Sequence, residues 1–134
     1  RSNHLKMKIL VPVSIGELFD KISILEIKKL KIKDEKKLLD IKFELKELKN
    51  IIKKKNLSNK ENTNQYKKLL NINKRLWNIE DKKRSYEKFK NFDEKFIQLA
   101  RKVYLLNDKR ALIKNKLNVL SGSKIKEVKS YEKY

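Results

Sequence analysis

Leucine, isoleucine and valine recur along much of the chain at alternating steps of three and four residues, the period of an amphipathic helix. The first such stretch follows the sequence SIGE at 14–17, a capping box whose serine hydroxyl and glutamate carboxylate satisfy free amides at a helix start. We therefore predict a helix from about residue 14 to residue 32. It carries two apolar stripes, one through Leu18 and Leu25 and one through Ile24 and Ile27, so we expect both sides to be buried.

The strictest periodicity lies in two stripes, over residues 38–52 and 69–79. The segment NLSNKENTN at 56–64 separates them, lacks apolar periodicity and is rich in turn formers, so we predict a loop there. Folding the chain back about this loop matches the layers of the two stripes. The facing pairs are then Ile52 with Leu69, Leu48 with Ile72, Leu45 with Leu76 and Ile41 with Ile79. This pattern predicts an antiparallel coiled-coil hairpin over about 34–88. Asp34 can be the N-cap of a second helix, or the first helix can continue through this residue without a break.

A last long helix is expected from the sequence NFDE at 91–94, where Asn91 can cap, to a stop at Gly122. We expect it to pack antiparallel on the helix of 14–32. The flanking segments MKILVPV (7–13) and KIKEVKSY (124–131) are candidates for a short antiparallel pair of terminal strands, which must rest on the helices or form across a homodimer. The expected fold is thus mainly all-α: a helical hairpin plus packed first and last helices.

The composition narrows the possible chemistry. At 134 residues, the chain suits a single helical domain over 7–134, preceded by RSNHLK at 1–6, which we interpret as an expression-tag remnant. The chain has no cysteine, and its only histidine, His4, lies in that remnant. We therefore expect no thiol or imidazole chemistry, no metal site and no cofactor. Since no apolar run approaches the roughly 18 residues of a membrane span, we expect a soluble, cytoplasmic protein.

The formal net charge of +20 suggests nucleic acid as a partner, because clustered cations release counterions from phosphates. Thirty-two of the 37 basic residues, however, are lysine, and asparagine and isoleucine are also frequent. These three residues share A/T-rich codons, whereas phosphate and base recognition favours arginine. We therefore rank a nucleic-acid partner below an unidentified protein partner, with a homodimer left open.

One charge interrupts the apolar stripe of the last helix. Arg110 stands where the pattern calls for a leucine, and a buried guanidinium without a partner is costly. We predict that it pairs with a carboxylate of the first helix, because the antiparallel register brings Glu26 near Arg110 and Asp20 near Lys114. Glu26 is the first choice and Asp20 the second, and Lys114 or Asn107 should border the same patch. Salt bridges that fix register are the favoured interpretation, ahead of a small polar pocket for an anionic or sugar-like ligand; an enzyme site is weaker still.

A second group, formed by Trp77, Glu80, Asp81 and Arg84, lies on the predicted hairpin. Trp77 flanks the apolar stripe, which is more typical of a core or a partner surface than of a sugar-stacking platform. Glu80 and Arg84 have the i, i+4 spacing of a surface ion pair. The adjacent carboxylates Glu80 and Asp81 should point to different sides of the helix, so we do not expect a catalytic acid–base pair.

The segments VPVSIGELFDKISILEIK, WNIEDKKR and LARKVYLLNDKRALIK, in this order, resemble a small bacterial family known only as a domain of unknown function. The resemblance covers nearly all of residues 7–134. It implies a gene neighbourhood of glycosyltransferases and surface-polysaccharide enzymes, but no catalytic residue. We therefore expect a non-enzymatic interaction or assembly module accompanying surface-glycan enzymes. The alternatives are an RNA- or phosphate-binding helical protein and, more weakly, a small-ligand enzyme.

Overall fold

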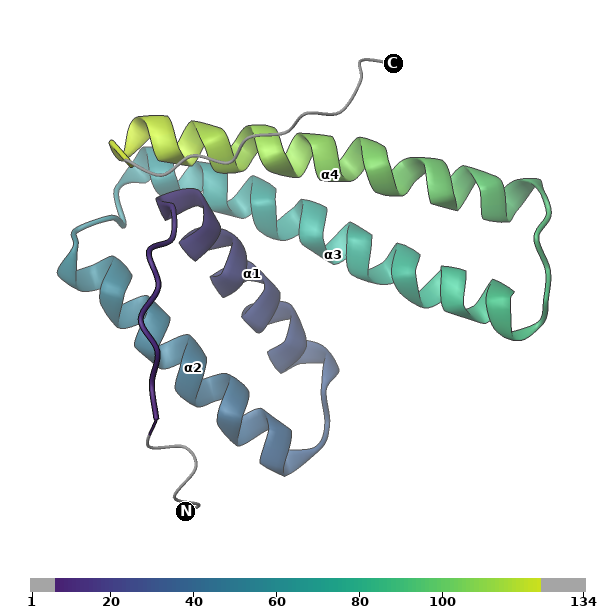
Figure 1. Ribbon diagram of the computed structural model, residues 1–134, viewed down its shortest axis with the longest axis horizontal. Helices are drawn as coiled ribbons and strands as arrows, with labels where there is room; N and C mark the ends of the chain where they lie inside the picture. Colours follow the sequence, from purple (N-terminus) through teal and green to yellow (C-terminus); the bar gives the residue numbers. More distant parts are fainter. Residues whose placement is uncertain (1–6, 124–134) are drawn as a thin grey trace.

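The computed structural model describes residues 7–123 and contains four helices. These are α1 (Ile15–Lys31), α2 (Glu35–Lys54), α3 (Lys60–Lys88) and α4 (Glu94–Leu120). As Figure 1 shows, α1 and α2 form one antiparallel pair, and the longer α3 and α4 form a second. Helix α1 packs against all three other helices and therefore joins the two pairs. The expected all-helical class is confirmed for these residues.

Side-chain caps define where each helix begins. Ser14, Asp34, Asn59 and Asp93 are the N-caps of the four helices, and the side-chain oxygen of each accepts a backbone amide of the first turn. Because Asp34 caps α2, α1 and α2 are separate helices. Since Asn59 caps α3, the loop after α2 is shorter than the predicted 56–64. The predicted cap at Asn91 is wrong, because Asp93 takes that role.

The predicted hairpin over 34–88 is wrong in its helix pairing. Helix α2 packs along α1, whereas α3 packs along α4 and α1, and the backbones of α2 and α3 do not pack together. The predicted facing pairs Leu48 with Ile72, Leu45 with Leu76 and Ile41 with Ile79 therefore do not form. Only Ile52, at the end of α2, packs against the cluster that contains its predicted partner Leu69. The physical reason lies in α1, whose two apolar sides both need burial. With α2 on one side and α3 and α4 on the other, α1 separates the two stripes that the sequence appeared to match.

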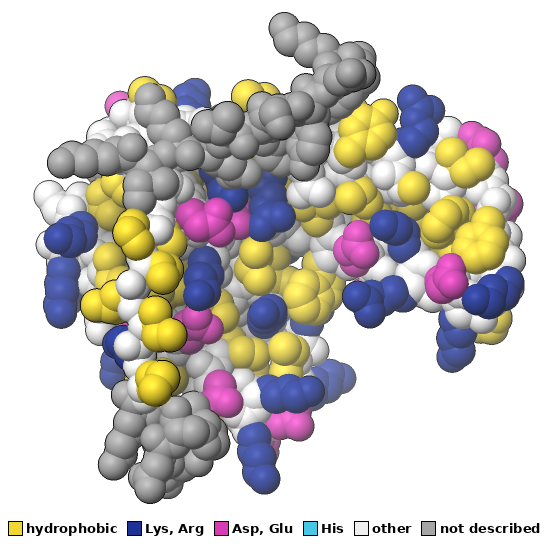
Figure 2. All heavy atoms as spheres, in the orientation of Figure 1, with side chains coloured by type: hydrophobic (Ala, Val, Ile, Leu, Met, Phe, Trp, Pro, Cys, Tyr) yellow, Lys and Arg dark blue, Asp and Glu magenta, His cyan; other side chains and the backbone are white. Residues whose placement is uncertain are grey.

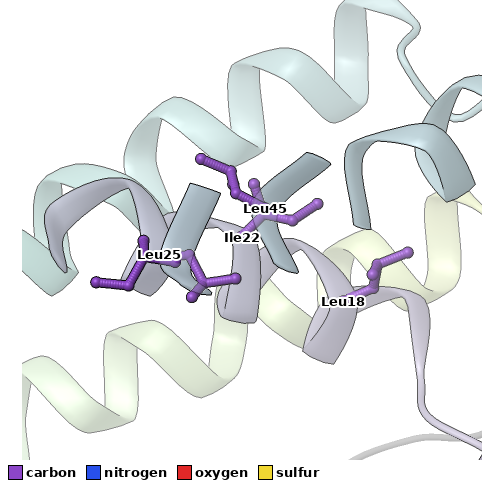
Figure 3. Packing of buried hydrophobic residues seen from close by; sticks show 5 residues of the cluster. Leu18, Ile22, Leu25 and Leu45 are labelled. Atoms are coloured by element: carbon purple, nitrogen blue, oxygen red, sulfur yellow. The ribbon is translucent and has the colours of Figure 1, made fainter. Parts of the chain in front are cut away.

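Each interface of α1 has its own apolar cluster. Toward α2, Leu18, Ile22 and Leu25 of α1 pack with Ile41 and Leu45 of α2. Figure 3 shows Leu45 lying beside Ile22 in this cluster. Burial of these side chains, each worth about 1.5–3 kcal/mol, holds α2 against α1.

The opposite side of α1 contacts the α3–α4 pair. There Phe19 packs with Leu69 of α3 and Leu117 of α4. Farther along the α3–α4 pair, away from α1, Ile72 and Ile79 pack with Leu106. The α3–α4 pair therefore has its own core and extends beyond the reach of α1.

The predicted terminal strand pair is not seen. Residues 7–14 have no regular secondary structure, and the predicted partner strand at 124–131 lies outside the described residues. Apolar side chains of this segment, including Ile9 and Leu10, are exposed, and Lys8 forms a 2.9 Å ion pair with Glu47 of α2. The segment thus crosses α2 (Figure 1) and contacts it through this ion pair.

Candidate functional site

The joint between α1 and α4 is unusually close because residue 16 is glycine. A Cβ on Gly16 would overlap the backbone carbonyl of Lys114, so only glycine fits there. The Gly16 amide donates a 2.6 Å hydrogen bond to Asn118 Oδ1, and the Ile15 amide donates to Ser123 Oγ. The start of α1 is therefore already satisfied by side chains from the end of α4, and it is not an anion site.

Lys114 is buried at the same joint but is paired differently from the prediction. Its Nζ lies 2.7 Å from Glu17 Oε2, whereas the register had placed it near Asp20. Because a glutamate one turn nearer the start of α1 reaches Lys114, Asp20 is left to another cation. The Glu17–Lys114 pair fixes the register of α1 on α4.

Arg110 and Asp20 form the central ion pair of the molecule. Arg110 Nε donates a 2.8 Å hydrogen bond to Asp20 Oδ1, and a second guanidinium nitrogen donates to Asp20 Oδ2. The Asp20 side chain is only 1% exposed, whereas that of Arg110 is 27% exposed. Asn107 lies at the edge, with its Oδ1 3.5 Å from Arg110. The prediction that Arg110 reaches a carboxylate of α1 is right, but the first choice of Glu26 is wrong.

Glu26 faces away from Arg110, toward α2. Its Oε1 lies 2.8 Å from Lys49 Nζ. On α1, Gly16, Asp20 and Ser23 share the side that meets α3 and α4, and Glu26 is on the other side, with the cluster that meets α2. Burial, together with the charge of Glu26, raises the pKa of nearby Tyr66 to about 12.

Two further polar residues complete the network around Asp20. Asn73 Nδ2 of α3 donates to Asp20 Oδ1 at 2.9 Å and to Ser23 Oγ at 2.7 Å. Sequence analysis missed both Asn73 and Ser23. The available signal was that a serine and an asparagine each interrupt a buried helical side, as Arg110 does. The three helices α1, α3 and α4 thus meet at one fully buried carboxylate.

Asn73 and Arg110 of this network line a cleft of about 440 Å³, and the part of the cleft beside them is its inner end. The cleft is lined by Ile24 and Ile27 of α1, by Asn73, Leu76, Trp77, Glu80, Asp81 and Arg84 of α3, and by Arg110 of α4. In the space-filling view, the surface is indented between the α1–α2 pair and the α3–α4 pair (Figure 2). The two groups of candidate residues that appeared separate in the sequence, around Arg110 and around Trp77, therefore share one cleft.

The wall supplied by α3 differs in detail from the prediction. Glu80 pairs with Lys83 at 3.4 Å instead of Arg84. Glu80 and Asp81 both line the cleft, although adjacent residues on a helix point about 100° apart, because an open cleft spans that arc. Trp77 is half-buried, so part of its ring faces the cleft rather than the core.

The charges of the cleft limit what it can do chemically. Both oxygens of Asp20 accept hydrogen bonds from Arg110, so this carboxylate is not free to take a proton from a ligand. Arg110 is offset by Asp20, and Arg84 stands near the carboxylates of Glu80 and Asp81. Cations and carboxylates nearly balance, which suits recognition of a polar, uncharged group.

Within residues 7–123, no cluster of three or more histidine, cysteine, aspartate or glutamate side chains is arranged to hold a metal ion. None of the helices in this range combines the length and apolar composition needed to span a bilayer.

Comparison with known proteins identifies a family for this chain. No curated protein and no solved structure matches the chain. One family model does match, and it covers residues 7–134, which include every helix and the whole cleft. The chain therefore belongs to the family of unknown function DUF6165.

Proposed function

We propose that the protein is a non-catalytic binding module that receives a neutral, polyhydroxylated ring, such as a sugar unit, in the cleft between α1, α3 and α4. The observation that carries the proposal is the convergence of half-buried Trp77 and the Asp20–Arg110 pair on this one cleft. Three helices must pack correctly to bring these groups together.

The lining of the cleft matches the chemistry of a sugar ring. Trp77 and Leu76 offer an apolar surface on which the C–H face of a pyranose can stack. Arg84 carries N–H donors, and Asp81 carries carboxylate acceptors, for hydroxyl groups at the ring edge. A ligand of this kind agrees with a module that accompanies surface-glycan enzymes.

The charge balance favours this ligand over a phosphate. A phosphate needs a net excess of cations, whereas Asp20 offsets Arg110, and the carboxylates of Glu80 and Asp81 line the same cleft as Arg84. An RNA- or phosphate-binding role draws support from the net charge of +20, and the cleft adds nothing to it. An enzyme role lacks a free general base at the inner end of the cleft, where Asp20 is held by Arg110.

Trp77 provides the test, because it is the only tryptophan in the chain and its emission reports on the cleft alone. We would titrate the protein with neutral hexoses, hexosamines and short oligosaccharides, and follow the intensity and wavelength of this emission. We expect a saturable change with at least one class of sugar. Asp81→Ala should weaken binding by about tenfold or more, the loss expected for hydrogen bonds to a charged group.

Glu87→Ala is the matched control, since Glu87 is an exposed carboxylate on the same helix that pairs only with Lys90 within the described chain. It should leave the titration unchanged. A panel that produces no saturable response, or a response that Asp81→Ala and Glu87→Ala alter equally, would contradict the proposal.

A further inference from the structure

A second surface lies on the α3–α4 pair, separate from the residues that line the cleft. One hollow of about 360 Å³ is lined by Lys68, Asn71, Ile72 and Arg75 of α3 and by Lys109, Leu112 and Ile113 of α4. A second hollow, of about 520 Å³, lies farther along the same two helices and includes Lys82, Ser85 and Tyr86 with Lys95, Gln98 and Leu99. Neither shares a residue with the cleft.

The two hollows lie two heptads apart along the same two helices, and together they are called the α3–α4 groove. Moving 14 residues along α3 takes Lys68 to Lys82, and moving 14 residues back along α4 takes Lys109 to Lys95. The apolar floor follows the same rule, since Ile113 in the first hollow becomes Leu99 in the second. Fourteen residues are two heptads, so the groove repeats with the period of a helical bundle.

Cations stand on both rims of this groove at seven-residue spacing. They are Lys68, Arg75 and Lys82 on α3 and Lys95, Lys102 and Lys109 on α4. All six are exposed, and in the part of the chain that the structure describes none of them pairs with a carboxylate. Glu94 is the only carboxylate that lines either hollow, and its Oε1 already accepts a hydrogen bond from Gln98. With a rise of about 1.5 Å per residue, neighbouring cations on each rim are about 10.5 Å apart along the helix axis. No carboxylate of the described chain pairs with them to neutralise their charge.

Exposed apolar side chains follow the same period on α4. Leu105, Leu112 and Val119 are spaced by seven residues and are 44%, 70% and 70% exposed. Leu112 also lines the first hollow. A phosphate backbone would not bury these apolar side chains, whereas the apolar face of an amphipathic helix would cover them and remove them from water.

We propose that this α3–α4 groove binds an acidic amphipathic helix of another protein, which lies along it and completes a three-helix bundle. The apolar stripe of that helix covers Leu112 and the floor formed by Ile72 and Ile113. Its flanking glutamates pair with the two rows of cations, as charges beside the seam do in coiled coils. A second copy of this chain does not fit, because the same face would set cations against cations.

The probe for this groove is a synthetic peptide of about four heptads, with leucine at the seam and glutamate on both flanks. A shuffled peptide of the same composition lacks the period but keeps the charge, and a uridine oligonucleotide supplies phosphates instead. Binding of each labelled probe to the full chain is measured by fluorescence anisotropy at about 0.15 M salt, where distant charges are screened.

We expect the heptad peptide to bind at least about tenfold more tightly than the shuffled one, a difference of about 1.4 kcal/mol. The double variant Arg75→Glu with Lys109→Glu should weaken this binding by a further tenfold or more, since it places like charges across the interface. Lys53→Glu with Lys54→Glu makes the same charge change at the end of α2 and should leave binding unchanged. Leu112→Ser keeps all charges and should weaken binding several-fold.

Equal binding of the heptad and shuffled peptides would overturn the proposal in favour of general charge attraction. Tighter binding of the oligonucleotide, lost in the Arg75→Glu with Lys109→Glu variant, would make the groove a phosphate-binding surface instead. Absence of peptide binding to a chain with native helix content would also reject it. The sugar titration at Trp77 is independent of these outcomes, because the cleft and the groove share no lining residue.

Discussion

Substitution of Arg110 by methionine tests whether the buried carboxylate of Asp20 depends on this single cation. The variant keeps an unbranched apolar stem but removes the guanidinium, so the Asp20 side chain, 1% exposed, retains only the hydrogen bond from Asn73. Removing one partner of a buried ion pair costs about 3–5 kcal/mol. For a chain of 134 residues, with an unfolding entropy of about 2.1 cal/mol/K per residue, this corresponds to a fall in Tm of roughly 11–18 °C.

The reverse substitution should be milder. Asp20→Asn leaves Arg110, but this side chain is 27% exposed and can hydrate through the cleft. We expect a loss of about 2 kcal/mol, within the range for a hydrogen bond to a charged group. The double variant should lose less stability than the two single variants together, and the difference should be at least about 1 kcal/mol.

Urea unfolding followed by circular dichroism at 222 nm measures all three variants, and an unchanged m-value confirms that the unfolded states are comparable. The reasoning is refuted if Arg110→Met costs no more than Asp20→Asn, because the argument rests on their unequal burial. Additive losses in the double variant would equally show that the two side chains are not energetically coupled.

Three further outcomes are expected. Gly16→Ala should cost about 1–3 kcal/mol in urea unfolding because its Cβ overlaps the Lys114 carbonyl, whereas Lys29→Ala on the exposed side of α1 should be neutral. Ser14→Ala should cost about 1 kcal/mol in the same assay, since it removes the acceptor of the Glu17 amide. The pKa of Tyr66 is raised to about 12 in the folded state, so its neutral phenol contributes stability below about pH 10 that is lost as the pH rises toward 12. Over that interval the wild type should lose stability more steeply than Tyr66→Phe in urea titrations at fixed pH, and parallel slopes would contradict the assignment.

The helices themselves were predictable because their signals are local. The capping box at Ser14 and the apolar stripes of α1 and α2 depend on residues within a few turns of each other. Helix pairing was not predictable in the same way. The stripes of α2 and α3 match each other in period, yet α2 packs along α1 and α3 packs along α4 and α1, so the pairing depends on all four helices together. The two-sided apolar pattern of α1 indicated its central place, but it did not identify the neighbour on each side.

The candidate site was likewise predictable from the sequence only in part. Arg110 in an apolar stripe correctly predicted a carboxylate on α1, because an unpaired buried cation is too costly. The choice between Asp20 and Glu26 required the rotation of α1 about its axis, which depends on how closely Gly16 lets α4 approach. The meeting of Trp77 with Arg110 joins residues of different helices, and no spacing in the sequence encodes it.

The close contact at Gly16 also makes α1 a lever with a fixed pivot. Its first turn is held to α4 by Asn118 and Ser123, while its far end leads only to α2. With a rise of about 1.5 Å per residue, a tilt of about 5° about Gly16 moves Asp20 by roughly 0.5 Å but Ile27 by roughly 1.4 Å. Such a tilt would leave the inner end of the cleft almost unchanged and would shift the wall of the cleft at Ile27. If the cleft receives the ligand proposed above, the tilt of α1 would change the size of ligand that fits and leave the polar contacts near Asp20 in place.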